Sequence, residues 1–265
     1  MINPRSRSLL IAVILASGLS LTSADAQSVY TSGHTDLGIG YEDGALVPHW
    51  HLDAGNIVDG SPLAEESEFA PEELVARFLT TRASASGSAD YLGVPTGTTL
   101  YMGGPSVAWQ PYLGFGSEEL DPGDWSTPIK ITLTGWTAPD GGEFSLYTTS
   151  LNGTSTVDIF LSTFDPSVAN IDGVDANAFN LPVGGHEHYT FGFTQEGYYT
   201  LTLQFSGTHA TDGFKTASGT FGFLIGPNAV VPEPSTSGLL IAVGLAFLVF
   251  FRKSRKRFAP FDSIR

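Results

Sequence analysis

The sequence contains no cysteine, and basic residues are rare between its two ends. Without cysteine the protein has neither a disulfide nor a thiolate metal site. The formal net charge is −15 over 265 residues, although both ends are basic. The basic residues of the acidic stretch between those ends are Arg77, Arg82, Lys130 and Lys215. Such a surface repels nucleic acid and anionic lipid and attracts cations.

Long apolar runs occur only at the two ends, and the first end has the three parts of a secretory signal peptide. Two arginines precede an apolar segment over 9–21, and Ala24-Asp25-Ala26 is a small-x-small cleavage site. The apolar segment is too short to predict a membrane-spanning helix. We therefore predict a signal peptide over 1–26 with a helical core. Signal peptidase would remove it and leave Gln27 as the first residue.

The second end also has three parts in a fixed order. Pro232-Glu233-Pro234 comes first, residues 238–251 form an uncharged apolar run, and five basic residues follow within 252–257. This end resembles the PEP-CTERM sorting signal of Gram-negative bacteria. The resemblance implies that an exosortase recognises the motif, cuts near it and passes the body to the cell surface.

These two ends divide the chain into five predicted parts: a signal peptide (1–26), a body (27–226), a linker with the sorting motif (227–237), a hydrophobic anchor helix (238–251) and a basic cytoplasmic tail (252–265). The apolar run is near the lower length limit for crossing a bilayer, and the basic cluster favours the cytoplasmic side. We therefore expect export through the inner membrane, with a transmembrane helix until processing. The destination would be the cell surface, outer membrane or extracellular space. A plain tail anchor is the alternative.

The body has the pattern of an all-β protein. Short alternating apolar and polar runs recur between Gly- and Pro-containing turns, which predicts a single antiparallel β-sandwich. Further strands are expected at 95–102, 130–136, 143–149, 156–161 and 218–225. A second hairpin is expected from residues 186–193 and 198–206. Residues 71–79 are the one helical candidate, because Pro71 fits a first-turn position.

The first predicted hairpin has a register that can be read from its turn. Asp43-Gly44 suits the positive φ angles of a two-residue turn. One face then carries an apolar set: Leu37, Ile39, Tyr41, Leu46, Trp50 and Leu52. The opposite, polar face pairs Gly38 with His49, Asp36 with His51, and His34 with Asp53. A slip by one residue would mix the two faces.

Four histidines form two His-x-His pairs, and each pair falls on the polar face of its predicted strand. Neutral imidazole is a good zinc ligand, and closed zinc sites take four ligands. We predict one zinc-type site with His49, His51, His186 and His188 as ligands, supported by His34, Asp36 or Glu187. The alternative is that these histidines are exposed strand residues with no ligand.

Several segments of the body, in order, resemble the choice-of-anchor M (surface-anchored protein) domain family. They are His34 to Gly44 with His49-Trp50-His51, Glu68 to Glu73, Trp109 to Glu119, Gly142 to Tyr147, and Gly185 to Leu201. The resemblance implies a receptor or relay that works with metal-type ABC transporters, and it makes the two His-x-His pairs the binding residues. Many members have a tryptophan two residues after the second pair, where this chain has Thr190-Phe191.

Other functions have weaker support in the sequence. Neither a Gly-x-Ser-x-Gly elbow nor a His-Glu-x-x-His helix motif is present, so we expect no enzyme. A structural or glycan-contacting module of a biofilm matrix is the main alternative, with exopolysaccharide as partner. Its sugar-stacking residues would be Trp109, Tyr112, Trp125 and Trp136. An acidic loop over 165–177 is a lesser calcium candidate.

Overall fold

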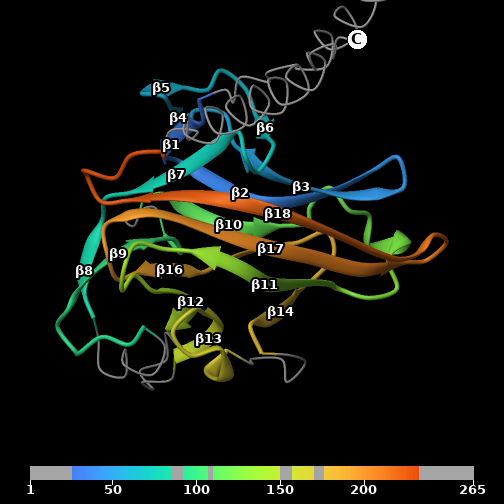
Figure 1. The fold of residues 1–265 in the computed structure, drawn as a ribbon. Helices are drawn as coiled ribbons and strands as arrows, with labels where there is room; N and C mark the ends of the chain where they lie inside the picture. The colour runs from blue at the N-terminus through green and yellow to red at the C-terminus, as the bar shows by residue number, and fades with distance from the viewer. Residues whose placement is uncertain (1–25, 85–91, 107–109, 150–156, 170–175, 233–265) are drawn as a thin grey trace, which may run out of the picture. The chain divides into compact units, whose positions relative to one another are not determined.

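Three β-sheets, which we call A, B and C, are formed by the residues that the computed structural model describes: 26–84, 92–106, 110–149, 157–169 and 176–232 (Figure 1). Sheet A has eight strands, in the order β14 (Ala178–Leu181), β11 (Ile129–Thr137), β17 (Gly197–His209), β18 (Gly213–Ile225), β7 (Leu74–Phe78), β1 (Ser28–Ser32), β4 (Ile57–Val58) and β5 (Ser61–Pro62). Sheet B has five, in the order β15 (His186–His188), β10 (Tyr112–Gly116), β2 (His34–Glu42), β3 (Ala45–Leu52) and β6 (Ser67–Phe69). Sheet C also has five, in the order β13 (Val157–Ser162), β12 (Phe144–Thr149), β16 (Thr190–Phe193), β9 (Thr99–Gly103) and β8 (Thr81–Ala83).

The all-β prediction is confirmed, and helical structure within the described ranges is limited to two short 3-10 turns, η3 (Pro122–Asp124) and η4 (Pro166–Val168). No helix long and apolar enough to cross a bilayer occurs in those ranges. The predicted signal peptide, apart from Ala26, lies outside the described residues, as do the anchor helix and the basic tail. The linker is described as far as Pro232.

The prediction of purely antiparallel sheets is wrong. Strand β7 runs parallel to both of its neighbours, β1 and β18, and β10 runs parallel to β2. Parallel neighbours need long connections instead of hairpin turns. The strands of sheet B therefore come from distant parts of the sequence, which places β15 beside β10 and close to the β2–β3 hairpin.

Aromatic side chains join the three sheets into one core. Trp50 of β3 lies edge-on to Phe221 and Phe223 of β18, with ring centroids 5.2 Å and 5.8 Å apart. From sheet C, Phe193 of β16 also contacts Phe223, with ring centroids 5.6 Å apart. Such edge-to-face and tilted pairs add to the free energy of apolar burial. Because sheet B uses one face for this core, its opposite face is left for polar side chains.

The helical prediction over 71–79 is wrong, since Leu74–Phe78 is strand β7. Leu74, Val75, Ala76 and Phe78 are all buried. This run is too apolar for a strand with one solvent-exposed face, but it is typical of a strand buried between parallel neighbours. Pro71 belongs to the turn before the strand.

The second predicted hairpin is also wrong. Residues 186–193 form two strands in different sheets, because the strand is interrupted at Tyr189 between β15 in sheet B and β16 in sheet C. Strand β16 pairs with β12 and β9, whereas β17 pairs with β11 and β18. The turn at 194–196 thus connects two sheets. The alternation of polar and apolar residues did not indicate this, because Thr190 is buried like its apolar neighbours.

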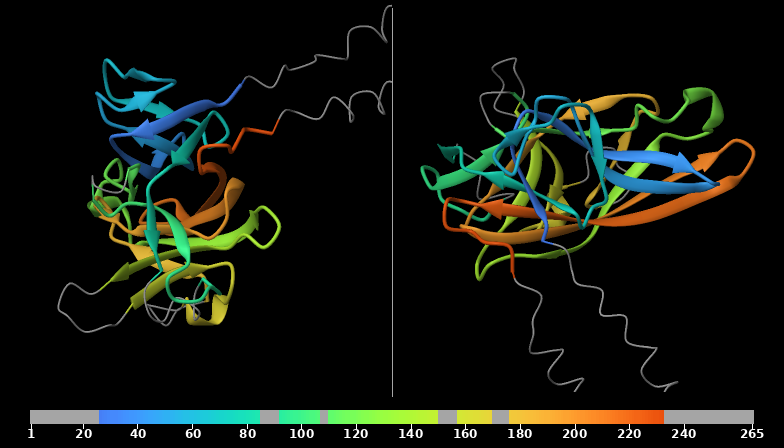
Figure 2. Two further views of the ribbon diagram at one scale, coloured as in Figure 1. Left: turned by 90° about the vertical axis from the view of Figure 1, so that its left-hand side faces the viewer. Right: turned by 90° about the horizontal axis from the view of Figure 1, so that it is seen from above.

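The first hairpin is confirmed with its register. Glu42 opposes Ala45, and Asp43 and Gly44 have φ angles of 48° and 82° at the turn. The hairpin extends beside the β17–β18 hairpin, as the right-hand view of Figure 2 shows. Lys215 Nζ donates a hydrogen bond to Gly44 O (2.8 Å), and Tyr41 Oη donates one to Asp212 Oδ2 (2.5 Å). These contacts hold the outer end of sheet B on sheet A.

Candidate metal centre

One face of sheet B carries all six histidine and aspartate residues that the sequence proposed for the site, and we call it the histidine face. The strand register arranges this face in two adjacent rows. One row contains His188, Gly114, Asp36 and His51, and the next contains His186, Gly116, Gly38 and His49. His34 lies on the same face of β2, two residues before Asp36, and is opposite Tyr112. The rows run from β15 to β3, across four strands.

Glycines make the room in which these side chains lie. A Cβ atom on Gly38 would be 2.5 Å from His49 Nε2, and one on Gly40 would be 2.7 Å from Glu119 Oε2. A Cβ atom on Gly116 would be 3.1 Å from the Cβ of Asp36. The first two distances are shorter than non-bonded atoms tolerate. The imidazoles and carboxylates can therefore lie across the central strands only because these positions have no side chain.

The first group of possible ligands, which we call the three-histidine cluster, contains His34, His186 and His188. One ligand atom from each lies within 4.8 Å of the other two. His34 Nδ1 contacts Asp53 Oδ2 at 3.0 Å, and His186 Nδ1 contacts Glu118 Oε1 at 2.6 Å. Because a carboxylate accepts a hydrogen bond from each Nδ1–H, both Nε2 atoms are left free for a metal. This is the usual carboxylate–histidine arrangement around protein-bound metals.

His188 completes this cluster from a position against Tyr112. The two rings are stacked, with centroids 4.2 Å apart and an interplanar angle of 12°. His188 Nε2 is buried and has no hydrogen-bond partner among the described residues. Burial lowers the pKa of His188 to about 4, and the neighbouring His34 and His186 add to this effect. The imidazole is therefore neutral at pH 7, which is the form that binds metals.

The second group, which we call the two-histidine cluster, contains His49, His51, Glu68 and Glu119, with one ligand atom of each within 4.8 Å of the others. His49 Nδ1 lies 3.0 Å from the carbonyl oxygen of Val47, which fixes the proton on Nδ1 and leaves Nε2 free. His49 Nε2 lies 2.8 Å from Glu119 Oε1. His51 Nδ1 lies 3.3 Å from the same oxygen, and its Nε2 lies 3.1 Å from Glu66.

The pKa values of this cluster reflect the close carboxylate. Burial lowers the pKa of His49, but the contact with Glu119 and the charge of Glu119 outweigh burial, so the pKa is raised above its ordinary value. The contact with His49 in turn lowers the pKa of Glu119 despite partial burial. A positive charge is therefore favoured between these two side chains, and either a proton or a metal ion can supply it.

Asp36 lies between the two clusters and is 1% exposed. Neither of its carboxylate oxygens has a hydrogen-bond partner among the described residues, and the nearest ionisable contact is His34 Nε2 at 3.7 Å. Burial raises the pKa of Asp36 to about 6, although the positive charges of His34 and His186 lower it. Buried carboxylates without partners are costly. This carboxylate is thus positioned to accept a cation.

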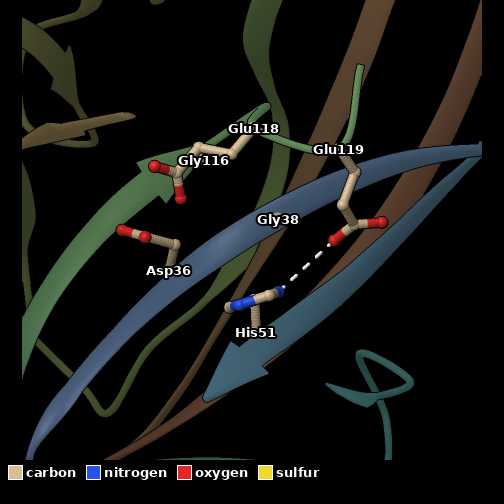
Figure 3. A pocket seen from close by; sticks show the side chains of 6 residues that line it. All are labelled: Asp36, Gly38, His51, Gly116, Glu118 and Glu119. Carbon is tan, nitrogen blue, oxygen red and sulfur yellow. Dashed lines mark hydrogen bonds and ion pairs between the residues drawn. The ribbon is translucent and has the colours of Figure 1, made fainter. Parts of the chain in front are cut away.

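Two consecutive glutamates in the turn after β10 contact different clusters. Glu118 contacts His186 of the three-histidine cluster, while Glu119 contacts His49 and His51. Ser117 holds the turn by donating its hydroxyl to the carbonyl oxygens of Pro182 (2.8 Å) and Gly185 (3.2 Å). In Figure 3 the Glu118 carboxylate lies beside Asp36, whereas the Glu119 carboxylate is directed to His51.

The pocket between these side chains is small. It is lined by Asp36, Gly38, His51, Gly116, Glu118 and Glu119 (Figure 3). Its volume of about 10 Å³ is roughly that needed by one water molecule. A space of this size is large enough for a single ion or water molecule.

The structure does not bring the four predicted ligands into one group. The pair His186/His188 belongs to the three-histidine cluster with His34, and the pair His49/His51 belongs to the two-histidine cluster. Asp36 lies between them as a shared neighbour. Glu187 is in neither group, since it lies at the opposite parity of β15 and is exposed. Of the sorting motif, only Pro232 is described; Glu233 and Pro234 lie outside the described residues.

Sequence reasoning missed the glutamates that complete the clusters: Glu66, Glu68, Glu118 and Glu119. Acidic residues are so common in this chain, at 27 Asp and Glu in total, that composition could not single them out. The Gly-x-Gly alternation at Gly114 and Gly116 directly before Glu118 was the available signal. It marks two successive positions on the outer face of the strand that have no side chain and therefore leave space for those of its neighbours.

The aromatic residues proposed for sugar stacking do not form a platform in the described part of the chain. Trp125 is buried, Tyr112 is covered by His188, and Trp136 is 44% exposed on β11. Trp109 lies outside the described residues, and so do residues 170–175 of the calcium candidate loop.

Comparison with known proteins gives one family match, at the C-terminal end. Residues 230–256 match the PEP-CTERM protein-sorting motif. No curated protein and no solved structure matches the chain. The match covers most of the linker, the apolar run and the first basic residues after it, so it bears on sorting and not on the body. The chain carries the sorting motif of exported, cell-surface proteins of Gram-negative bacteria, which is processed by an exosortase.

Proposed function

We propose that this protein is an exported, surface-displayed module that binds a divalent transition-metal ion, with zinc as the ion that the donor set favours. The ligands are His34, His186 and His188, with Asp36 as the fourth. The observation that carries the proposal is the convergence of three imidazoles beside a buried carboxylate that has no other partner among the described residues.

The donor set supports zinc on chemical grounds. Three imidazoles and one carboxylate are ordinary zinc ligands, with Zn–N bonds of about 2.0–2.1 Å. Tetrahedral ligands at that distance lie about 3.4 Å apart, so small ring rotations close the present spacing of up to 4.8 Å. Hard ions such as calcium prefer six or more oxygen ligands. The net charge of −15 would also raise the local concentration of cations.

The same donor set favours capture over catalysis. Four protein ligands fill a tetrahedral coordination sphere, whereas catalytic zinc sites keep one position open for water. We therefore propose a receptor or relay that passes its ion to components of a metal transporter, and not an enzyme. The resemblance of the body to the choice-of-anchor M domain suggests the same role. The alternative of a glycan-contacting matrix module has less support, because among the described tryptophans only Trp136 is exposed.

The test is a calorimetric titration of Zn²⁺ into the metal-free full chain, purified in detergent without a histidine tag. We expect submicromolar binding at pH 7.5 that weakens strongly near pH 5, since imidazoles must lose their protons to bind. The variant His188→Ala should lose a binding step. The matched control is His209→Gln, because His209 lies in neither cluster. Equal titration curves for the parent and His188→Ala would overturn the proposal.

A further inference from the structure

We infer that the histidine face holds two divalent metal ions side by side, the second on His49, His51 and Glu119 with Glu68 beside them. This deepens the proposed function and rests on it for the first ion. Both ions would lie next to Asp36. The protein would then be a two-ion carrier instead of a single-site receptor.

The second site has the same construction as the first. Each of its two histidines has one nitrogen fixed by an outer partner: the Val47 carbonyl oxygen for His49 Nδ1, and Glu66 for His51 Nε2. The remaining nitrogens, His49 Nε2 and His51 Nδ1, both approach Glu119 Oε1. Outer partners of this kind orient ligating imidazoles in metal proteins.

An independent observation points to a ligand at this position. His49 is 4% exposed, and its Nε2 is buried without a hydrogen-bond partner among the described residues, even though Glu119 Oε1 is only 2.8 Å away. A neutral imidazole with its proton on Nδ1 would present a lone pair to a carboxylate oxygen. Either a proton or a metal ion between the two atoms removes this repulsion, and a metal ion would use each atom as a ligand.

Charge balance also calls for more than one cation. Within the described part of the chain, the ion pairs of Glu66, Glu118 and Glu119 are all with histidines. Histidines are mostly neutral at pH 7 unless a carboxylate raises their pKa. Asp36, Asp53 and Glu68 add three further carboxylates to the same face. A single divalent ion would balance only two of these six carboxylate charges, so carboxylates remain for a second ion.

The two sites are too far apart to be one and close enough to interact. Histidines of the first cluster come from β15 and β2, and those of the second come from β3. The first cluster spans β15 to β2 and so is centred over β10, two strands from β3. Adjacent strands are about 4.8 Å apart, so the two centres are roughly 10 Å from each other. The strand pairing places Asp36 between the two sites, with Gly114 of β10 on one side and His51 of β3 on the other. The Glu118–Glu119 turn supplies one carboxylate to each side.

The experiment counts bound Zn²⁺ per full chain by equilibrium dialysis and elemental analysis, with excess free metal removed. We expect two ions for the parent, one for His49→Ala/His51→Ala, one for His186→Ala/His188→Ala and none for the combined variant. Copper-loaded parent should also give an electron paramagnetic resonance spectrum with dipolar broadening from two nearby ions. Each double variant should lose that broadening.

The outcomes separate the two proposals. One ion in the parent, retained by His49→Ala/His51→Ala, would overturn the second site and leave the proposed function intact. One ion that is lost in His49→Ala/His51→Ala but retained in His186→Ala/His188→Ala would overturn the first site. No ion in the parent would overturn both. Unfolding curves at pH 7.5 in EDTA would check that each variant is folded.

Discussion

Glu119 Oε1 lies 2.8 Å from His49 Nε2, the imidazole nitrogen that the Val47 carbonyl oxygen leaves free. In the metal-free protein a proton on Nε2 is stabilised by this carboxylate, so the pKa of His49 is raised. The same atoms are the ligands of the second proposed ion. Proton and metal therefore compete for one position. The contact between Glu119 and His49 can be tested without any metal.

The variant Glu119→Gln should lower the pKa of His49, because burial then acts against only the weaker effects of the Val47 carbonyl and Glu68. The measurement is a pH titration of the imidazole signals by NMR in the presence of EDTA, with Glu72→Gln as the control. The effect on stability has a defined sign. A raised pKa in the folded state contributes stability below the ordinary histidine pKa, and this contribution is lost as pH rises through the raised value. Glu119→Gln should thus be more destabilising at pH 6 than at pH 9. An unchanged titration of His49 would contradict the contact.

Asp36 should make the metal-free protein less stable than it would be with a neutral residue. Its pKa is raised from 3.8 to about 6, so the folded state holds this proton more tightly than the unfolded state. Stability is therefore lost as pH rises from 3.8 to about 6 and is constant in this respect above that. The difference corresponds to about 3 kcal/mol. We expect Asp36→Asn to raise the free energy of unfolding by up to this amount at pH 8 in EDTA, and to change it little at pH 4.

The control for Asp36→Asn is the same measurement with saturating zinc. If Asp36 serves the ions, the parent gains more stability from zinc than the variant does, because only the native state holds the assembled site. Denaturant unfolding of the parent and of the variant, each in EDTA and in saturating zinc, gives four free energies of unfolding at pH 8 and four at pH 4. A variant that is less stable than the parent at pH 8 in EDTA would show that Asp36 has a favourable partner in the metal-free protein.

The sequence predicted the β2–β3 hairpin in full, because a two-residue Asp-Gly turn and a clean alternation of residues fix a register. It also predicted which histidines share a face. It failed where contacts depend on the arrangement of distant strands. The interruption at Tyr189, which directs β15 and β16 to different sheets, has no local signal, because both faces of β16 are buried. The division of the two His-x-His pairs follows from β10 and β2, which both lie between β15 and β3 in the sheet.

Gly38 should be required for the second site although it donates no ligand. A methyl group at this position would lie 2.5 Å from His49 Nε2, so the imidazole must rotate away. We expect Gly38→Ala to weaken zinc binding at the two-histidine cluster by about 10–100-fold, as other displaced supporting residues do. Binding at the three-histidine cluster should remain. The matched control is Gly135→Ala on β11, where the nearest atom to an added Cβ would be 3.6 Å away. Equal zinc affinities for both variants would show that the imidazole has other positions from which it binds.

Arg77 should hold the linker that leads to the sorting motif. From strand β7 its guanidinium donates hydrogen bonds to the carbonyl oxygens of Gly226 (3.2 Å), Pro227 (3.4 Å) and Ala229 (3.0 Å). Ala229 is buried against Val75 and Leu224. The linker is thus bound to the body until directly before the motif at 230–256, so its release would lengthen the free chain available to the exosortase.

The variant Arg77→Met keeps most of the apolar stem and removes all three hydrogen bonds. Hydrogen bonds to a charged group contribute about 1.5–3 kcal/mol each, although the contributions of the three bonds do not simply add. We expect amide exchange over 224–231 to accelerate by at least about tenfold, which corresponds to about 1.4 kcal/mol of lost local stability. Exchange in β17 should not change. Arg82→Met on β8 is the charge-matched control, because it lies in sheet C, away from the linker. If the linker exchanged at the parent rate in Arg77→Met, apolar packing of Ala229 would be sufficient to hold it, and Arg77 would have no part in presenting the sorting motif.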